Sequence, residues 1–178
     1  MTRTRSVSRR EFARATAAGF GAGLLASAAE VAAQAPATRD GRPEALRSEF
    51  LMDLVLETRP SVSLGARTIV EVSGGTFEGP RLRGRVLSPG ADWPLAVRPD
   101  LRILDVRLLL VTDDEQRIYM TYRGLIHTPP AGQGERYWRT TPIFETDSKK
   151  YEWLTQAVFV GVSFQVPQRV SYRVFQIL

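Results

Sequence analysis

The sequence contains no cysteine and a single histidine, His127, among its 178 residues. Without thiols the chain forms no disulfide and offers no thiolate ligand to zinc, copper or an iron–sulfur cluster. One histidine is too few for the multi-histidine centres of common metalloenzymes. No GxSxG motif indicates a Ser-His-Asp triad, and His127 precedes a proline-rich turn, where we expect it to be solvated. We therefore expect the chain to need no cofactor.

The positive charge of the chain is concentrated at its beginning. Residues 1–35 carry five arginines and two glutamates, so they supply +3 of the formal charge of +5, and the remaining residues supply +2. In that remainder the arginines are scattered among acidic residues, without a dense basic stripe. Nucleic-acid-binding proteins concentrate cations on one face, so we expect no nucleic-acid partner.

The first 35 residues have the layout of an export signal. Ser8–Phe12 combines a polar residue, two arginines, a glutamate and a bulky apolar residue, and a weakly apolar run follows from Ala15 to Ala29. Small residues then permit cleavage between Ala33 and Ala37. This order is typical of twin-arginine signal peptides, whereas a spanning helix needs roughly 20 strongly apolar residues. We expect the twin-arginine machinery to export a periplasmic or secreted protein that keeps no stable membrane span after cleavage.

The remaining residues divide into a short linker and one domain. Residues 36–48 are polar and contain proline and glycine, which favours a flexible linker, and residues 49–178 show a β pattern throughout. The candidate strands are residues 49–57, 67–73, 81–88, 92–98, 101–112, 116–126, 138–146, 156–165 and 169–178. Only residues 148–154 look helical. We expect an all-β fold, a small antiparallel closed β-barrel of about eight or nine strands with little helix.

Six sequence blocks carry a resemblance to a known family. They are GGTFEGPRLRGRV (74–86), PGADW (89–93), RPD (98–100), TDDEQRIYMTYRG (112–124), YWRTTPIFET (137–146) and YEWL (151–154). In this order they resemble domain-of-unknown-function family 3237, also called uncharacterised protein family 0311, over residues 50–178. The resemblance implies a small β-barrel and no agreed activity. Glu115 stands where the family's turn usually has glycine, which bears on the tightness of that hairpin.

Two carboxylates are candidates for proton transfer. Asp92 precedes Trp93 in the PGADW block, and burial beside a large ring would raise its pKa and suit it to act as a general base. Alternatively, Asp92 bonds its own backbone in a turn and Trp93 belongs to the core. Glu78 stands at the lip of a glycine-rich turn, either as an acid or base at a pocket rim or as a solvated side chain at a barrel corner.

Arginines and aromatic residues are candidates for binding a substrate. Arg107 lies in the apolar stretch RILDVRLLLV, where a guanidinium needs a carboxylate partner unless it faces a pocket and binds an anion. Arg139 lies between an aromatic residue and a threonine and is a second candidate anion site. Trp93, Tyr122 and Trp138 would line the cavity.

These residues leave three hypotheses for function. The first is an enzyme without a metal, a lyase, isomerase or hydrolase, in which Asp92 or Glu78 moves a proton and Arg107 or Arg139 holds an anionic oxygen. The second is a non-catalytic carrier of an apolar or aromatic metabolite in the same cavity. The third is an interaction protein whose barrel interior is solid core. A small-molecule ligand is the expected partner in the first two.

Overall fold

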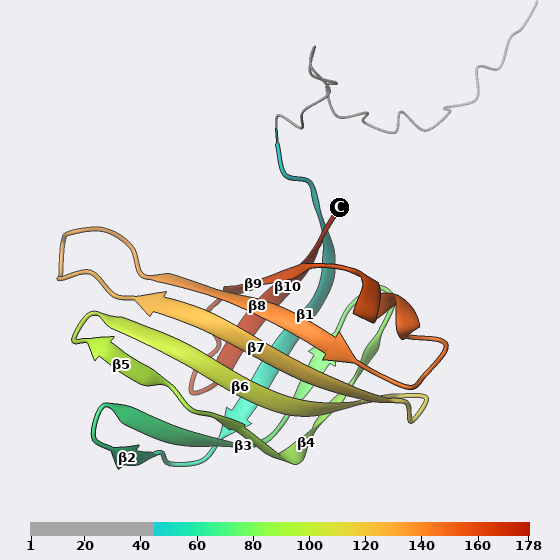
Figure 1. Cartoon of the computed structure of the whole chain (residues 1–178), viewed down its shortest axis with the longest axis horizontal. Helices are drawn as coiled ribbons and strands as arrows, with labels where there is room; N and C mark the ends of the chain where they lie inside the picture. The colour runs from blue at the N-terminus through green and yellow to red at the C-terminus, as the bar shows by residue number, and fades with distance from the viewer. Residues whose placement is uncertain (1–44) are drawn as a thin grey trace, which may run out of the picture. The chain divides into compact units, whose positions relative to one another are not determined.

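The strands of this protein close into a β-barrel (Figure 1). The computed structural model describes residues 45–178, which form ten strands and one short 3₁₀ helix. They are β1 (Ser48–Thr58), β2 (Val62–Leu64), β3 (Arg67–Glu78), β4 (Arg83–Asp92), β5 (Leu95–Arg98), β6 (Leu101–Thr112), β7 (Arg117–His127), β8 (Tyr137–Glu145), η1 (Glu152–Gln156), β9 (Phe159–Ser163) and β10 (Val170–Ile177). The predicted all-β fold is confirmed, whereas the predicted export signal and most of the linker lie outside the described residues.

Eight of the strands make the barrel wall. Their order is β1-β10-β9-β8-β7-β6-β4-β3, every pair is antiparallel, and β3 pairs back onto β1. In Figure 1, β6, β7 and β8 lie side by side across the front, and β1 and β10 cross behind them. Two short strands lie at the margin of the wall. Strand β2 pairs with β3, and β5 pairs with β3 and β6. Because the wall is closed, each of its eight strands has a partner on both sides, although β8 and β9 pair only at Arg139 with Val162 and at Thr140 with Gly161.

Alternation of side chains along the strands fills the barrel. In β6, Leu104, Val106, Leu108 and Leu110 are at most 2% exposed, whereas Asp105 and Arg107 between them lie on the outer face. The same period of two applies to Met52, Leu54 and Leu56 of β1 and to Ile118, Met120 and Tyr122 of β7. Each fully buried side chain of this size contributes roughly 1.5–3 kcal/mol. One face of each strand therefore builds the core.

The glycine-rich block places backbone against backbone where β3 meets β1. Gly75 has φ +146°, and a Cβ at this position would overlap the carbonyl oxygen of Val55. The β1–β3 register shifts between Glu57 and Thr58, where one residue step on β1 faces two on β3, so β3 carries a bulge here. Such a bulge bends a strand and helps the sheet to close.

A second irregularity brings the end of β4 to the interior. Leu87 pairs with Leu109 and Ala91 with Arg107, so four residue steps on β4 face two on β6. Because the extra steps are even in number, alternation is preserved and Asp92 lies opposite the fully buried Val106. The side chain of Asp92 therefore points inward.

Among residues 45–178, no helix has the length and apolar character needed to cross a membrane.

A substitution at Gly75 tests how much the close pairing of β3 with β1 depends on glycine. We expect Gly75→Ala to lower the free energy of unfolding by at least about 2 kcal/mol, because a methyl group adds both backbone strain and overlap with β1. Gly65→Ala is the matched control, since Gly65 has φ +59° but open space around it, and it should cost only about 1 kcal/mol. Equal losses for the two variants in urea denaturation would contradict this account.

Candidate functional site

Asp92 is the carboxylate that the fold places inside the barrel wall. It ends β4, pairs in register with Val106 of β6 and Val70 of β3, and is half-buried. Its Oδ1 accepts a hydrogen bond from the backbone N–H of Asp105 at 3.1 Å. The N–H of Trp93 in turn donates to the Asp105 carbonyl at 3.0 Å. The side chain is therefore held by backbone from the neighbouring strand and has limited freedom to turn away.

The surroundings of Asp92 favour its protonated form. Burial raises the pKa of Asp92 to about 6, the backbone N–H of Asp105 opposes the rise, and the negative charge of Asp105 adds to it. Among the described residues no lysine or arginine forms an ion pair with Asp92. A carboxyl group with a pKa near 6 can both release and accept a proton close to neutral pH, as a general acid or base must.

Two buried tyrosines lie near Asp92. Tyr122 pairs with Val106 and contacts Tyr172 of β10 edge to face, with ring centroids 5.5 Å apart. Burial raises the pKa of both phenols, and the charge of Asp92 raises both further. Both hydroxyls therefore stay protonated at neutral pH and can donate hydrogen bonds.

Trp138 completes this group from β8. Its ring meets that of Tyr172 edge to face at 5.5 Å, and the guanidinium of Arg136 lies 4.4 Å from its ring centroid. The indole Nε1–H is buried and has no well-aligned acceptor among the described residues, although it lies close enough to the Tyr172 hydroxyl to lower the pKa of that phenol. A buried donor without a partner is costly and uncommon, and it is satisfied when a ligand or water brings an oxygen. We refer to Asp92, Tyr122, Trp138 and Tyr172 as the Asp92 cluster.

Three of the seven predicted site residues belong to this cluster, namely Asp92, Tyr122 and Trp138. The structure places Arg107 and Trp93 outside it. The guanidinium of Arg107 lies 3.2 Å from Asp105 and 5.3 Å from the ring centroid of Trp93, and half of its side chain is exposed. Arg107 has the carboxylate partner that its apolar strand required, and it does not face Asp92.

Glu78 and Arg139 are also separated from Asp92. Glu78 is exposed at the end of β3, eight residues beyond Val70, which pairs with Asp92, and eight residues of strand span about 26 Å. Arg139 follows Trp138 on β8 and therefore lies on the outer face. Tyr172, in contrast, joins the cluster without having been predicted. The only signal in the sequence was its alternation with Val170 and Val174.

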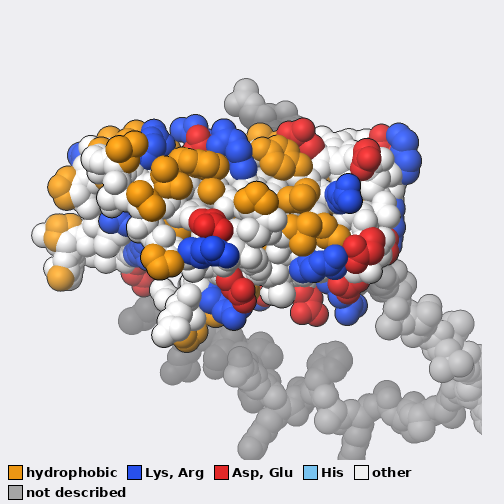
Figure 2. Space-filling view, turned by 90° about the horizontal axis from the view of Figure 1, so that it is seen from below, with side chains coloured by type: hydrophobic (Ala, Val, Ile, Leu, Met, Phe, Trp, Pro, Cys, Tyr) orange, Lys and Arg blue, Asp and Glu red, His pale blue; other side chains and the backbone are white. Residues whose placement is uncertain are grey.

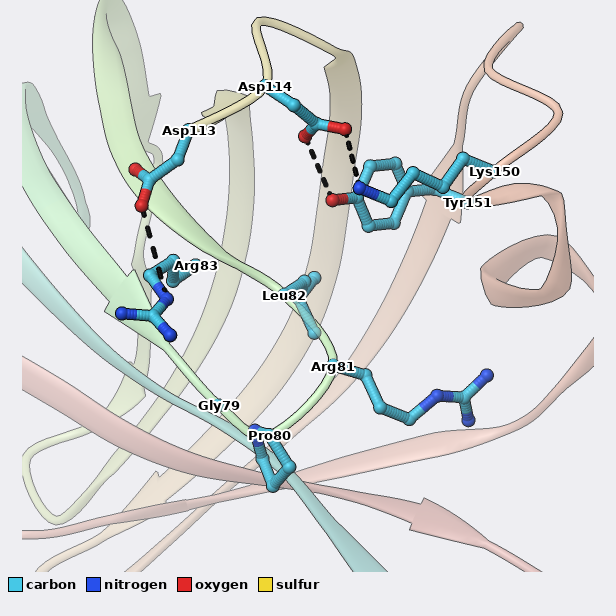
Figure 3. Close-up of a pocket in the computed structure, with 9 residues that line it drawn as sticks. All are labelled: Gly79, Pro80, Arg81, Leu82, Arg83, Asp113, Asp114, Lys150 and Tyr151. Atoms are coloured by element: carbon cyan, nitrogen blue, oxygen red, sulfur yellow. Dashed lines mark hydrogen bonds and ion pairs between the residues drawn. The ribbon is translucent and has the colours of Figure 1, made fainter.

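A polar pocket of about 240 Å³ lies at the other end of β4 (Figure 3). It is formed by the β3–β4 turn, the β6–β7 turn and the segment before η1. Lys150 and the Tyr151 hydroxyl both donate to Asp114, the latter at 2.9 Å, and Arg83 lies 4.0 Å from Asp113. Arg81 points away from both aspartates, and its guanidinium stacks 3.5 Å from the ring centroid of Trp153.

The charges of this polar pocket satisfy one another. Hydrogen bonds from Lys150, then from Thr112, hold the pKa of Asp114 well below its usual range. Asp114 thus stays ionised and joins the β6–β7 turn to the segment before η1, which is a structural role.

Within residues 45–178 no three His, Asp or Glu side chains are grouped as metal ligands. The Asp92 cluster is therefore the stronger candidate site.

The raised pKa of Asp92 predicts a dependence of stability on pH. Its pKa is about 6 in the folded protein and about 3.9 when unfolded, so the folded state binds the extra proton between these values. Stability contributed by this group is present below about pH 4 and is lost as the pH rises to about 6, by roughly 3 kcal/mol at most. Asp92→Asn keeps the acceptor oxygen without the charge.

We therefore expect the unfolding free energy of Asp92→Asn to rise relative to that of the native chain between pH 4 and pH 7.5, by about 2–3 kcal/mol. Urea denaturation of both proteins at the two pH values measures this difference. The contributions of all other titratable groups cancel, because both proteins contain them. Asp113→Asn, at an exposed carboxylate, is the control and should show no such change. A difference between Asp92→Asn and the native chain that is independent of pH would disprove the assignment.

The barrel and its sequence have relatives in bacteria and fungi. The family model described as protein of unknown function (DUF3237) matches residues 46–177. A UPF0311 protein of Rhodopseudomonas palustris is 31% identical over 128 residues, covering 66% of this chain and 84% of the relative. A β-barrel-like protein of Acinetobacter baumannii superposes with a TM-score of 0.71 at 33% identity, covering 77% of this chain and 99% of that one. An enzyme from Penicillium herquei shares the fold with a TM-score of 0.62 at 22% identity, covering 77% and 98%. This chain belongs to the DUF3237 family.

Proposed function

We propose that this protein is an enzyme that moves a proton on a small organic molecule bound at the Asp92 cluster. The observation that supports this most is a half-buried carboxylate that has no cationic partner among residues 45–178 and lies near two protonated phenols. A group of this kind lowers the stability of the fold, so its presence calls for a chemical role. The fold also occurs in an enzyme from Penicillium herquei.

Each side chain of the cluster has a role in such a reaction. Asp92, ionised at neutral pH, takes a proton from a C–H or O–H group of the substrate. The electron pair left behind moves onto a substrate oxygen, which accepts hydrogen bonds from Tyr122, Tyr172 or the Trp138 N–H. Protonated Asp92 then returns the proton to another atom, or the proton leaves with a hydroxide as water. The products are an isomer or a compound that differs by one water.

A carrier of an aromatic metabolite is the alternative function. Tyr122, Tyr172 and Trp138 meet edge to face, an arrangement that suits contact with a further ring. A carrier would use the same residues but needs no proton transfer. The raised pKa of Asp92 favours the enzyme.

Metabolite profiling separates these functions. The purified protein is incubated with a metabolite extract of its host, and products are compared by mass spectrometry with those of Asp92→Asn and of the exposed control Asp113→Asn. We expect the native chain and Asp113→Asn to convert the same compound, with unchanged mass or a change of one water. Asp92→Asn should convert it at least about 100-fold more slowly, since acid–base groups contribute this much.

The pH dependence gives a second readout of the same proposal. Because Asp92 must be ionised to accept the proton, kcat/KM should fall tenfold per pH unit below about pH 6, following its pKa. A compound that is retained but never converted would establish the carrier instead. Conversion by Asp92→Asn at the native rate would refute the role of Asp92.

We also propose that the chain is exported by the twin-arginine route, on the motif Ser8–Phe12. Replacing Arg9 and Arg10 together by lysine should leave the uncut precursor in the cytoplasm, because the pair of arginines is the recognised feature of these signals. Cell fractionation and immunoblotting of the tagged full chain measure this. Replacing Arg3 and Arg5 by lysine makes the same charge-conserving change outside the motif and should leave export intact. Export that is equal in both variants would contradict the proposal.

A further inference from the structure

A second cavity lies on the outer face of the barrel. It has a volume of about 520 Å³ and extends over β6, β7, β8 and β9. Ile103, Leu125 and Arg139 lie side by side across three of these strands. Each of them is next in sequence to a residue that faces the core, namely Leu104, Gly124 and Thr140. They therefore lie on the outer face of the sheet. We call this cavity the outer groove; its size is within the range of roughly 300–1,000 Å³ of small-molecule sites.

The wall of the outer groove is apolar where a barrel normally faces water. Leu125 is 39% exposed and Tyr137 is 48% exposed, and Ile103 and Val160 lie half-buried beside them. Figure 2 shows one face of the molecule, on which hydrophobic side chains lie among cationic and acidic ones. In the outer groove, apolar side chains and two arginines line one open depression.

The charged residues that line the outer groove are both arginines. Arg139 donates from Nη1 to the Trp138 carbonyl at 2.9 Å, and its guanidinium lies 4.9 Å from the ring centroid of Tyr137. These contacts fix its orientation and leave other N–H groups for a ligand, since a guanidinium has five. Arg123 donates to Asp105 at 3.4 Å and forms an ion pair with it, while 68% of its side chain stays exposed. Asp105 does not line the groove, and Arg139 forms no ion pair among the described residues, so the guanidinium of Arg139 gives the groove a positive charge complementary to an anion.

We propose that the outer groove binds a small amphipathic monocarboxylate. Its carboxylate lies between Arg139 and Arg123, which offer the paired N–H donors that such a group accepts. Its apolar body lies against Ile103, Leu125 and Val160, with the ring of Tyr137 along one side. This site is separate from the Asp92 cluster, because its side chains lie on the opposite face of β7 and β8.

Octanoate is a suitable probe, with octan-1-ol as the uncharged analogue of the same length. Isothermal titration calorimetry on the full chain should show one saturable site for octanoate and at least about tenfold weaker binding of octanol, the loss of one charge-assisted hydrogen bond. Arg139→Gln and Arg123→Gln should each weaken octanoate binding by about tenfold or more. Thermal melts confirm that these surface variants remain folded.

Two control variants locate the site. Arg117→Gln removes an exposed cation from the same strand as Arg123 but outside the outer groove, and Asp92→Asn alters only the interior site. Both should bind octanoate as the native chain does. The proposal is overturned if octanoate does not bind, if neither groove variant weakens it, or if Asp92→Asn does. It is also overturned if sedimentation shows a dimer that Leu125→Arg separates, because a second copy would then occupy the groove.

Discussion

The pairing of β1 with β3 is the constraint on which the rest of the structure depends. It joins the first wall strand to the last in the spatial order and turns a sheet into a barrel. Once the wall is closed, every strand has one face toward a limited interior and one toward water, and alternation assigns each side chain to one of them. The close approach of Gly75 to the Val55 carbonyl is the local condition for this pairing. The two candidate binding sites are consequences of it, because they use opposite faces of the same strands.

Alternation let the sequence predict the fold well. The apolar face of residues 101–112 and the punctuation between strands gave the barrel and most strand positions. The errors lie where tertiary contacts override the local pattern. Strand 81–88 actually starts at Arg83 and runs through a bulge to Asp92, the three residues of β2 are too few to show a period, and the helix expected at residues 148–154 is a 3₁₀ helix at Glu152–Gln156. Glu115 adopts φ +58° where glycine is usual, yet the turn is closed by its N–H to Thr112 at 2.9 Å, and Arg85 holds its carboxylate.

The site was harder to predict than the fold, because it depends on register between strands. Asp92, Tyr122 and Trp138 were each singled out by residue type, but only the pairings of Asp92 with Val106 and of Val106 with Tyr122 bring the first two together. Tyr172 comes from the last strand, and no local pattern connects it to Asp92. The enzyme hypothesis placed Arg107 or Arg139 in a pocket with Asp92, and the alternative for Arg107 was a structural ion pair. Their odd-numbered positions on β6 and β8 put them on the outer face, next to Leu108 and Trp138 that face inward.

The closed wall also explains why a carboxylate can remain at the Asp92 position. An unpaired buried charge in a flexible protein would recruit water or a cation and recover an ordinary pKa. Here the Asp105 N–H fixes one carboxylate oxygen, and Tyr122 and Tyr172, at most 3% exposed, keep their surroundings apolar. The rigid barrel wall therefore maintains an environment in which the ionised form of Asp92 is less stable than it is in water. A binding partner that brings an oxygen to the Trp138 N–H would give a well-aligned acceptor to a donor that has none among the described residues, so occupation of the cluster and stability of the barrel should increase together.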